Sequence, residues 1–285
     1  MPLMPLMPRL RIGALFATLV IPTGGAQAQG VLVAPHAIVI DHRTRSGSLS
    51  LYNPSDAPTE VTLSTFFGYP VTDSAGEFEL RTVEGPDLTM PSAADWVEAF
   101  PKRMLLRPKE RQTVRLLARP PARLVDGEYW ARLVVAAKGG PVPVTGVDDS
   151  SGVTVGLNLE VRTVLPLQYR KGRVATSIRL SRLSAAIERD SLAVRMRLDR
   201  MGTAAFIGTV RGALADSAGR TVTSFSSPVA VYFDIEPRFT APLPEGLPSG
   251  RYRLHVEVAT ERADLAPESL LLSRPVRDSL EVRLP

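Results

Sequence analysis

The feature that most constrains the fold is a repeated two-residue alternation of apolar and polar side chains. From residue 31 onwards, short runs rich in Val, Leu, Ile, Thr and Tyr are separated by Pro, Gly, Asn and Asp. No segment keeps a helical period long enough to predict a helix. Alternation with period two is typical of strands that bury one face, and many short strands between turn signals indicate a sandwich. The sequence therefore predicts an all-β protein.

The predicted strands fall into two sets. The first set comprises residues 31–41, 46–53, 60–67, 97–100, 103–106, 113–118, 127–136 and 153–167. The second set follows residues 169–172 and comprises residues 191–198, 206–214, 221–225, 229–233, 238–242, 250–259 and 279–284. Sets of this size suit two ordinary domains. We therefore expect two immunoglobulin-like β-sandwich domains in tandem, at residues 29–170 and 171–285.

Turn chemistry supports this division. Residues 73–76 and 216–219 carry Asp, Ser, Ala and Gly, and the second of these is predicted to close a hairpin. Tyr252 begins a late strand, where a tyrosine that closes a sandwich corner is expected, although a surface aromatic residue explains it nearly as well.

The first thirty residues have the three parts of a secretory signal. Arg9 and Arg11 precede an apolar run at residues 12–21, and the small residues Ala26 and Ala28 flank Gln27. The apolar run is shorter than the roughly twenty residues that a spanning helix needs. An uncleaved anchor is the alternative. We expect a signal peptide at residues 1–28, no stable membrane insertion, and export to the periplasm or, alternatively, to the cell surface or the medium.

Composition narrows the functional classes. The chain has no cysteine, so an exported domain must be held by core burial alone. Its 34 Lys and Arg against 29 Asp and Glu are interspersed, which does not favour nucleic acid and only weakly favours acidic partners.

No catalytic or metal-binding pattern is recognisable. His36, His42 and His255 lack the spacing of a zinc motif, and no nucleophile elbow or phosphate-binding glycine loop is present. Asp148 and Asp149 could bind calcium, but a solvated loop explains them better. We therefore predict neither an enzyme nor a cofactor nor a metal site, and a binding function instead.

The segment at residues 153–165 alternates most strictly. Val155, Leu157, Leu159 and Val161 share one face with Val153, and polar residues occupy the other. Such a strand either packs on its own core or, because it follows a long loop, projects and is added to the sheet of another protein.

Several pieces of the first half resemble the periplasmic pilus chaperones of the PapD-like family. They lie at residues 33–41, 48–54, 105–115, 126–130 and 167–170, in the family's order and spacing. The resemblance covers nearly the whole first domain, whereas the second domain matches in size and class alone. It implies two immunoglobulin-like domains set in an L, which lend an alternating apolar strand to exported pilus subunits and work with an outer-membrane usher.

The resemblance also implies roles for single residues. Val155, Leu157, Leu159 and Val161 would be the donated side chains, and Glu128 and Arg170 would form an interdomain salt bridge. The family's two cations for the subunit's terminal carboxylate fall on His36 and Pro166, and proline has no donor. Arg162, with Arg43 and Arg170, is a cation that could compensate in this cleft.

Three functions follow as hypotheses. The first is a periplasmic chaperone that caps strand-incomplete pilus or fimbria subunits, and the main alternative is a non-chaperone envelope or surface protein that binds or builds through its immunoglobulin-like domains. The last is an enzyme or ligand receptor of unrecognised type. An exposed apolar strand is prone to pair with itself. We therefore expect self-dimerisation when no client is bound.

Overall fold

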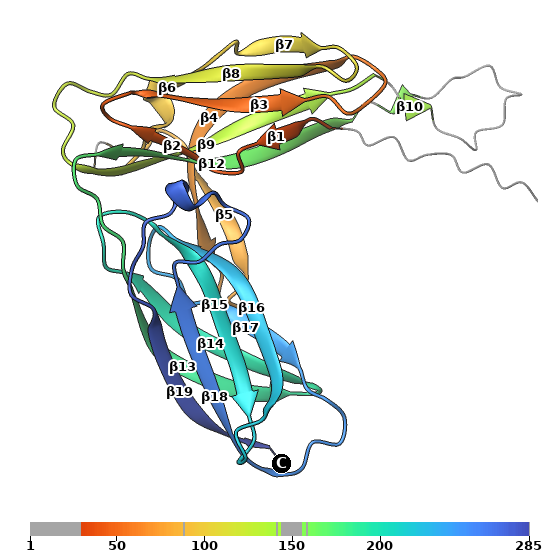
Figure 1. Ribbon diagram of the computed structural model, residues 1–285, viewed down its shortest axis with the longest axis vertical. Helices are drawn as coiled ribbons and strands as arrows, with labels where there is room; N and C mark the ends of the chain where they lie inside the picture. The colour runs from red at the N-terminus through yellow and green to blue at the C-terminus, as the bar shows by residue number, and fades with distance from the viewer. Residues whose placement is uncertain (1–29, 88, 141, 144–155, 158, 285) are drawn as a thin grey trace, which may run out of the picture.

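The protein folds into two β-sandwiches that meet at an angle and form an L (Figure 1). The computed structural model describes residues 30–87, 89–140, 142–143, 156–157 and 159–284. The expected signal peptide and the loop with Asp148 and Asp149 lie outside the described residues. No helix among the described residues is long and apolar enough to cross a membrane.

The first sandwich contains one four-stranded and one larger sheet. The four-stranded sheet has the order β1 (Leu32–Ala34), β3 (Ser46–Tyr52), β8 (Arg111–Ala118) and β6 (Val97–Phe100). The larger sheet has the order β2 (Ile38–Asp41), β12 (Glu160–Lys171), β9 (Gly127–Lys138), β4 (Thr59–Thr72) and β5 (Phe78–Val83), and β7 (Arg103–Leu106) also pairs with β4. A short 3-10 helix, η1 (Ala94–Trp96), precedes β6.

The second sandwich follows the single crossing of the chain between the two parts. Its first sheet has the order β13 (Ile178–Glu188), β14 (Ser191–Arg200) and β17 (Arg238–Pro242). Its second sheet has the order β16 (Thr221–Val231), β15 (Phe206–Ala215), β18 (Gly250–Ala259) and β19 (Val276–Leu284). A 3-10 helix, η3 (Pro267–Ser269), lies in the connection between β18 and β19.

Each sandwich buries its own apolar face, as the alternation predicts. Leu49, Leu63 and Leu133 fill the first core, and Leu198 and Leu254 fill the second. The hydroxyl of Tyr252 donates a hydrogen bond to the carbonyl of Pro248 at 2.9 Å, so the predicted corner tyrosine is confirmed. The all-β prediction is confirmed as well.

Some strand predictions were wrong in detail. Residues 31–41 form two strands in different sheets, β1 and β2, because the chain turns at Pro35 and His36. The strand predicted at 60–67 extends to Thr72 and returns as β5, whose residues are mostly exposed and which was not predicted. The strand β13 was missed altogether.

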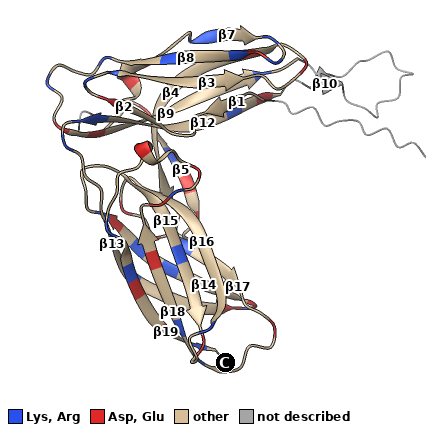
Figure 2. Ribbon diagram, viewed as in Figure 1, with Lys and Arg blue, Asp and Glu red and all other residues tan. Residues whose placement is uncertain are grey.

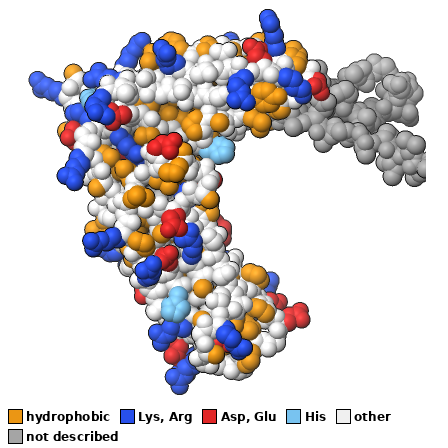
Figure 3. All heavy atoms as spheres, in the orientation of Figure 1, with side chains coloured by type: hydrophobic (Ala, Val, Ile, Leu, Met, Phe, Trp, Pro, Cys, Tyr) orange, Lys and Arg blue, Asp and Glu red, His pale blue; other side chains and the backbone are white. Residues whose placement is uncertain are grey.

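Charged side chains of both signs are spread over both sandwiches (Figures 2 and 3). Many ion pairs among the described residues, such as Arg103–Glu60 and Arg251–Glu281, are exposed pairs on strands, of the kind that adds little stability. In Figure 3 apolar side chains lie between these charges on the visible face. The charge distribution therefore does not mark a functional face.

Candidate partner-binding site

The strand β12 is paired on both sides over only part of its length. It pairs with β9 throughout, from Glu160 opposite Lys138 to Lys171 opposite Gly127. On its other side it pairs with β2 over residues 167–170 alone. Among the described residues, nothing pairs with this second side at residues 160–166, because β1 pairs with β3 in the other sheet. In the described part of the chain, residues 160–166 of β12 are therefore a free sheet edge.

The direction of the backbone groups at this edge follows from two neighbouring contacts. The carbonyl of Arg170 accepts a hydrogen bond from the His42 N–H at 2.9 Å, so residue 170 points towards β2. Opposite Gln168, the N–H and carbonyl of Trp130 bond to residues 91 and 93, away from β12. Alternation then directs the backbone groups of residues 160, 162, 164 and 166 to the free edge.

Pro166 fits this edge. Because its backbone points away from β9, its missing N–H removes no hydrogen bond from the ladder. The free edge thus offers the N–H and carbonyl groups of Glu160, Arg162 and Val164, and the carbonyl of Pro166.

The apolar side chains at this end of the strand are partly exposed. Leu159 is 42% exposed and Val161 is 38% exposed, whereas Leu165 and Leu167 are buried in the first core. Val164, on the other face, is 40% exposed. Of the predicted donor residues, Val155 lies outside the described residues, and for Leu157 only the backbone is described.

Before β12 the chain forms a short ribbon that extends the sheet. The strand β11 (Gly156–Leu157) pairs with β10 (Val142–Pro143), with Leu157 opposite Val142. In Figure 1 β10 lies beyond the end of the first sandwich. The segment with Leu157 therefore projects from the sheet as part of a hairpin.

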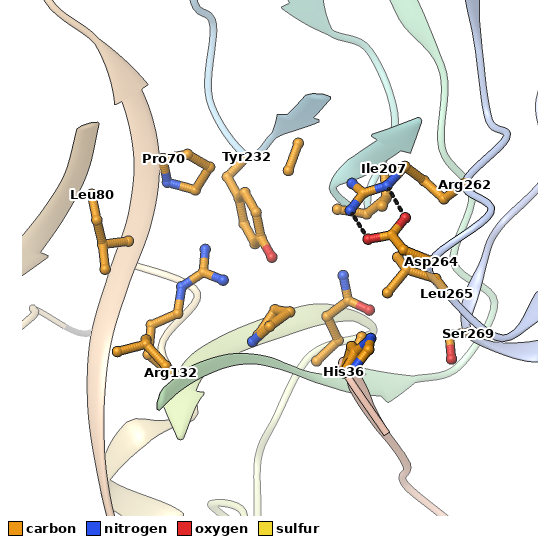
Figure 4. A pocket seen from close by; sticks show the side chains of 15 residues that line it. His36, Pro70, Leu80, Arg132, Ile207, Tyr232, Arg262, Asp264, Leu265 and Ser269 are labelled. Atoms are coloured by element: carbon orange, nitrogen blue, oxygen red, sulfur yellow. Dashed lines mark hydrogen bonds and ion pairs between the residues drawn. The ribbon is translucent and has the colours of Figure 1, made fainter. Parts of the chain in front are cut away.

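A pocket lies where the free half of β12 ends, between the two sandwiches (Figure 4). Its volume is about 320 Å³. The first sandwich contributes residues from β4, β5, β9 and β12, and the second contributes residues from β15, β16 and the β18–β19 connection. The lining includes His36, Leu80, Arg132, Val164, Pro166, Gln168, Ile207, Tyr232, Arg262, Asp264 and Leu265.

Arg132 is the buried cation of this pocket. It is 7% exposed, its Nε donates to the Gly68 carbonyl at 2.9 Å, and its guanidinium lies 4.9 Å from the centre of the Tyr232 ring. Among the described residues no carboxylate lies within ion-pair distance of it. Leaving a buried charge without a counter-charge is costly, so the arrangement favours an anion at this position.

Tyr232 stands beside this cation. Burial raises the pKa of its hydroxyl, and the neighbouring Arg132 acts in the opposite direction. The phenol therefore stays protonated at physiological pH and can donate a hydrogen bond. In Figure 4 the side chains of Arg132 and Tyr232 approach the same space from facing elements.

The other charged groups of the pocket are a second arginine and its partner. Arg262 donates to both carboxylate oxygens of Asp264, at 2.7 and 2.6 Å. These bonds lower the pKa of Asp264, with a smaller contribution from His36. His36 thus lies at the pocket, as the resemblance implied, but near an acid of the protein itself.

Arg162 is not part of this lining. Its Nε lies 2.5 Å from Glu160, and both side chains stand on the outer half of β12 beside a separate shallow hollow. The arginines of the lining are instead Arg132, which is buried, and Arg262, which pairs with Asp264.

Glu128 and Arg170 meet at the junction. The Arg170 Nε donates to Glu128 at 2.8 Å, and the same arginine bonds to the Ser269 carbonyl of the second sandwich at 2.9 Å. The other carboxylate oxygen of Glu128 accepts hydrogen bonds from the indole of Trp130 and the backbone N–H of Ala205. This pair therefore ties β9 and β12 to the second sandwich.

Sequence reasoning missed Arg132, Gln168 and Tyr232. Arg132 gave one signal, since it is the one charged residue within the otherwise apolar stretch 129–137 of β9. Tyr232 and Gln168 gave none, because their role depends on the contact between two sandwiches.

Comparison with known proteins gives similarity at the level of structure. No family model matches the chain, and no curated protein matches it in sequence. Among solved structures, it is similar to the Salmonella enterica SafB chaperone in complex with the SafA pilin, with 17% identity, 89% of this chain and 98% of that chain covered, and a TM-score of 0.43. It is also similar to the Pseudomonas aeruginosa CupB2 chaperone, with 12% identity, 89% and 100% covered, and a TM-score of 0.44. The chain is similar to the YadV chaperone as well, with 13% identity, 88% of this chain and 99% of that chain covered, and a TM-score of 0.44.

Each of these solved structures is, or contains, a chaperone.

Proposed function

We propose that this protein is a periplasmic chaperone that binds exported, β-rich pilus or fimbria subunits and completes their unfinished sheet with β12. The observation that carries this proposal is the free edge of β12 at residues 160–166, next to a half that is paired on both sides. An unpaired edge with exposed apolar side chains is a template for adding a strand from another chain.

The chemistry of the edge suits this mode of binding. The outward backbone groups of Arg162 and Val164 supply hydrogen bonds without regard to the client's sequence. Leu159 and Val161 supply apolar side chains, and Val155 and Leu157 extend the proposed set along the projecting ribbon. Backbone bonds give affinity in such complexes, and the side chains give selectivity.

The end of the client strand is also constrained. A strand added along residues 160–166 meets β2 at Leu167 and cannot continue. At this place Arg132 lies opposite Pro166 on the neighbouring strand and lines the pocket. A terminal carboxylate would give the buried guanidinium of Arg132 its missing counter-charge, with Tyr232 as a second donor. We propose that clients end here.

Further partners follow from the same proposal. An outer-membrane usher would receive the client, and the free edge would pair with a second copy of this chain when no client is present. Sedimentation at rising concentration measures the second point. A strict monomer at high concentration would contradict self-pairing and leave client binding unaffected.

The proposal is tested by capture from the native cell envelope with the mature protein as bait. We expect recovery of small exported β-rich subunits, and we expect Leu159→Asp to abolish it, because the charge would be buried in an apolar contact. Leu105→Asp is the matched control, since Leu105 is exposed on β7 at the opposite side of the sheet.

Two results would contradict the proposal. One is equal recovery with both variants, and the other is recovery of polysaccharide or large surface proteins alone. The latter would favour a non-chaperone protein of the envelope.

A further inference from the structure

The hairpin of β4 and β5 reaches from the first sandwich to the second. The strand β4 pairs with β9 only up to Phe66. Beyond it, residues 67–72 of β4 pair with residues 78–83 of β5 and not with β9. Six residues of a strand span about 20 Å. In Figure 1 this hairpin runs down alongside the second sandwich.

The tip of the hairpin is fastened to the second sandwich by backbone and side-chain contacts. The Gly76 carbonyl accepts a hydrogen bond from the Arg238 N–H at 3.0 Å, and the Thr72 hydroxyl accepts one from the Glu236 N–H at 2.9 Å. The ring of Phe78 lies 6.3 Å from that of Phe239. These contacts involve the segment that leads into β17.

The base of the hairpin is fastened separately. The Tyr69 ring lies 4.6 Å from the Phe233 ring, which in turn lies 5.6 Å from the ring of Trp130. The Glu128–Arg170 pair lies nearer to the single crossing of the chain. The hairpin tip is thus a second attachment, set off from the first by the length of the hairpin.

The turn at the hairpin tip, residues 73–76, occurs a second time at residues 216–219, where the glycine has open space in place of the Arg238 backbone. Comparison of the two turns separates the docking of the tip from the geometry of the turn itself. Residues 73–76 and 216–219 have the same sequence, and in both the glycine N–H bonds to the aspartate carbonyl, at 3.1 and 3.0 Å. The φ angles of Gly76 and Gly219 are 88° and 80°. A Cβ on Gly219 would meet nothing within 4 Å, whereas one on Gly76 would lie 2.8 Å from the Arg238 nitrogen.

We propose that the β4–β5 hairpin is a brace that fixes the angle between the two sandwiches, and that Gly76 is the position at which the brace docks. Domains joined by one crossing move relative to one another by default. A contact near the crossing resists rotation weakly, because it lies close to the pivot. The hairpin tip resists it strongly, because it acts at the end of a lever.

The brace lies within the chain and needs no client, so it is tested on the free protein. Because the chain has no cysteine, spin labels are placed at Arg115→Cys on β8 and Arg253→Cys on β18, two exposed positions in different sandwiches. Pulsed electron resonance then gives the distribution of the distance between the labels. Gly76→Ala and Gly219→Ala are compared in this background, since both strain the same turn.

We expect a narrow distribution in the parent, the same width in Gly219→Ala, and a width at least about twofold greater in Gly76→Ala. Thr72→Val, which removes one hydrogen bond without strain in the turn, should broaden it less; it serves as the test should Gly76→Ala fail to fold. A parent distribution already as broad as that of the variants, or unchanged widths in Gly76→Ala and Thr72→Val, would overturn the brace. Equal broadening in Gly76→Ala and Gly219→Ala would overturn it too.

Discussion

The two halves of β12 belong to one strand but have different surroundings. Residues 167–170 lie between β9 and β2, and Leu167 and Tyr169 are fully buried. Residues 160–166 have β9 on one side and, in the described part of the chain, nothing on the other. Their apolar residues Val161 and Val164 are partly exposed.

This difference separates a structural role from the proposed binding role within one continuous strand. The closed half is held by pairing on two sides and by the core, so its residues should determine stability. The open half is paired with β9 alone, so its exposed residues should be replaceable without unfolding, whereas Leu165 belongs to the core. Substitutions matched between the halves test whether the division is real.

The largest contrast is expected for the two arginines of β12. Arg170→Met leaves Glu128 buried without its cation, which should lower the free energy of unfolding by about 3–5 kcal/mol. Arg162→Met removes an exposed pair with Glu160 and should change it by less than about 1 kcal/mol. Urea denaturation measures both, and equal losses would remove the distinction between the halves.

The leucines give the next contrast. Leu167→Ala opens a cavity in the first core and should cost about 2–5 kcal/mol. Leu159→Ala, at a half-exposed site, should cost less than about 1.5 kcal/mol, because little apolar area is lost from burial. Thermal unfolding of the two variants is the measurement. A similar fall in Tm for both would show that Leu159 belongs to the core.

Arg132→Met sharpens the comparison at the place where the open half ends. Removing a buried cation that has no described counter-charge should leave the Tm equal to or above that of the parent. Affinity for a client with a free terminal carboxylate should fall by about 2 kcal/mol or more, as for the loss of one partner of a buried charge pair. The same client with an amidated terminus should bind both proteins equally. A fall in Tm without loss of affinity would contradict the anion site.

The smallest effect is expected at Asp264, beside the same pocket. Its hydrogen bonds from Arg262 lower its pKa below the usual value of 3.8, so the stability it contributes is present above that value and is lost as the pH falls through the lower folded pKa. Asp264 is more than half exposed, so the contribution should stay below about 1 kcal/mol. The difference between parent and Asp264→Asn should be constant above pH 5 and vanish in stronger acid. A difference that grows towards low pH would contradict this sign.

The sequence predicted those parts of the fold that depend on local pattern. Strands with one buried face, such as β17 and β18, alternate visibly and were located at their observed bounds. The strand β5 was missed although Phe78 and Leu80 alternate with Glu79 and Arg81, because the run is only six residues long and neither of its faces is buried in a core.

The candidate site was less predictable. Alternation at Leu159 and Val161 predicted a partner-binding strand, and this stays a prediction, but the unpaired edge depends on where β1 pairs, which is a long-range property. The pocket depends on Arg132 of the first sandwich and Tyr232 of the second, which are a hundred positions apart in the sequence. The resemblance put the family's cation positions on His36 and Pro166, whereas the buried Arg132 of the pocket follows from the packing of the two sandwiches alone.

The most direct test of the account is amide hydrogen exchange along the outer edge of β12, resolved by residue, in the free protein and in a complex with a captured subunit. In the free protein the amides of Arg162 and Val164 should exchange rapidly, whereas those of Gln168 and Arg170, on the same side of the strand, should be protected by β2. In the complex, Arg162 and Val164 should become protected as well. Equal protection of all four amides in the free protein, or no added protection at Arg162 and Val164 in the complex, would contradict the claim that this half of β12 is the partner's edge.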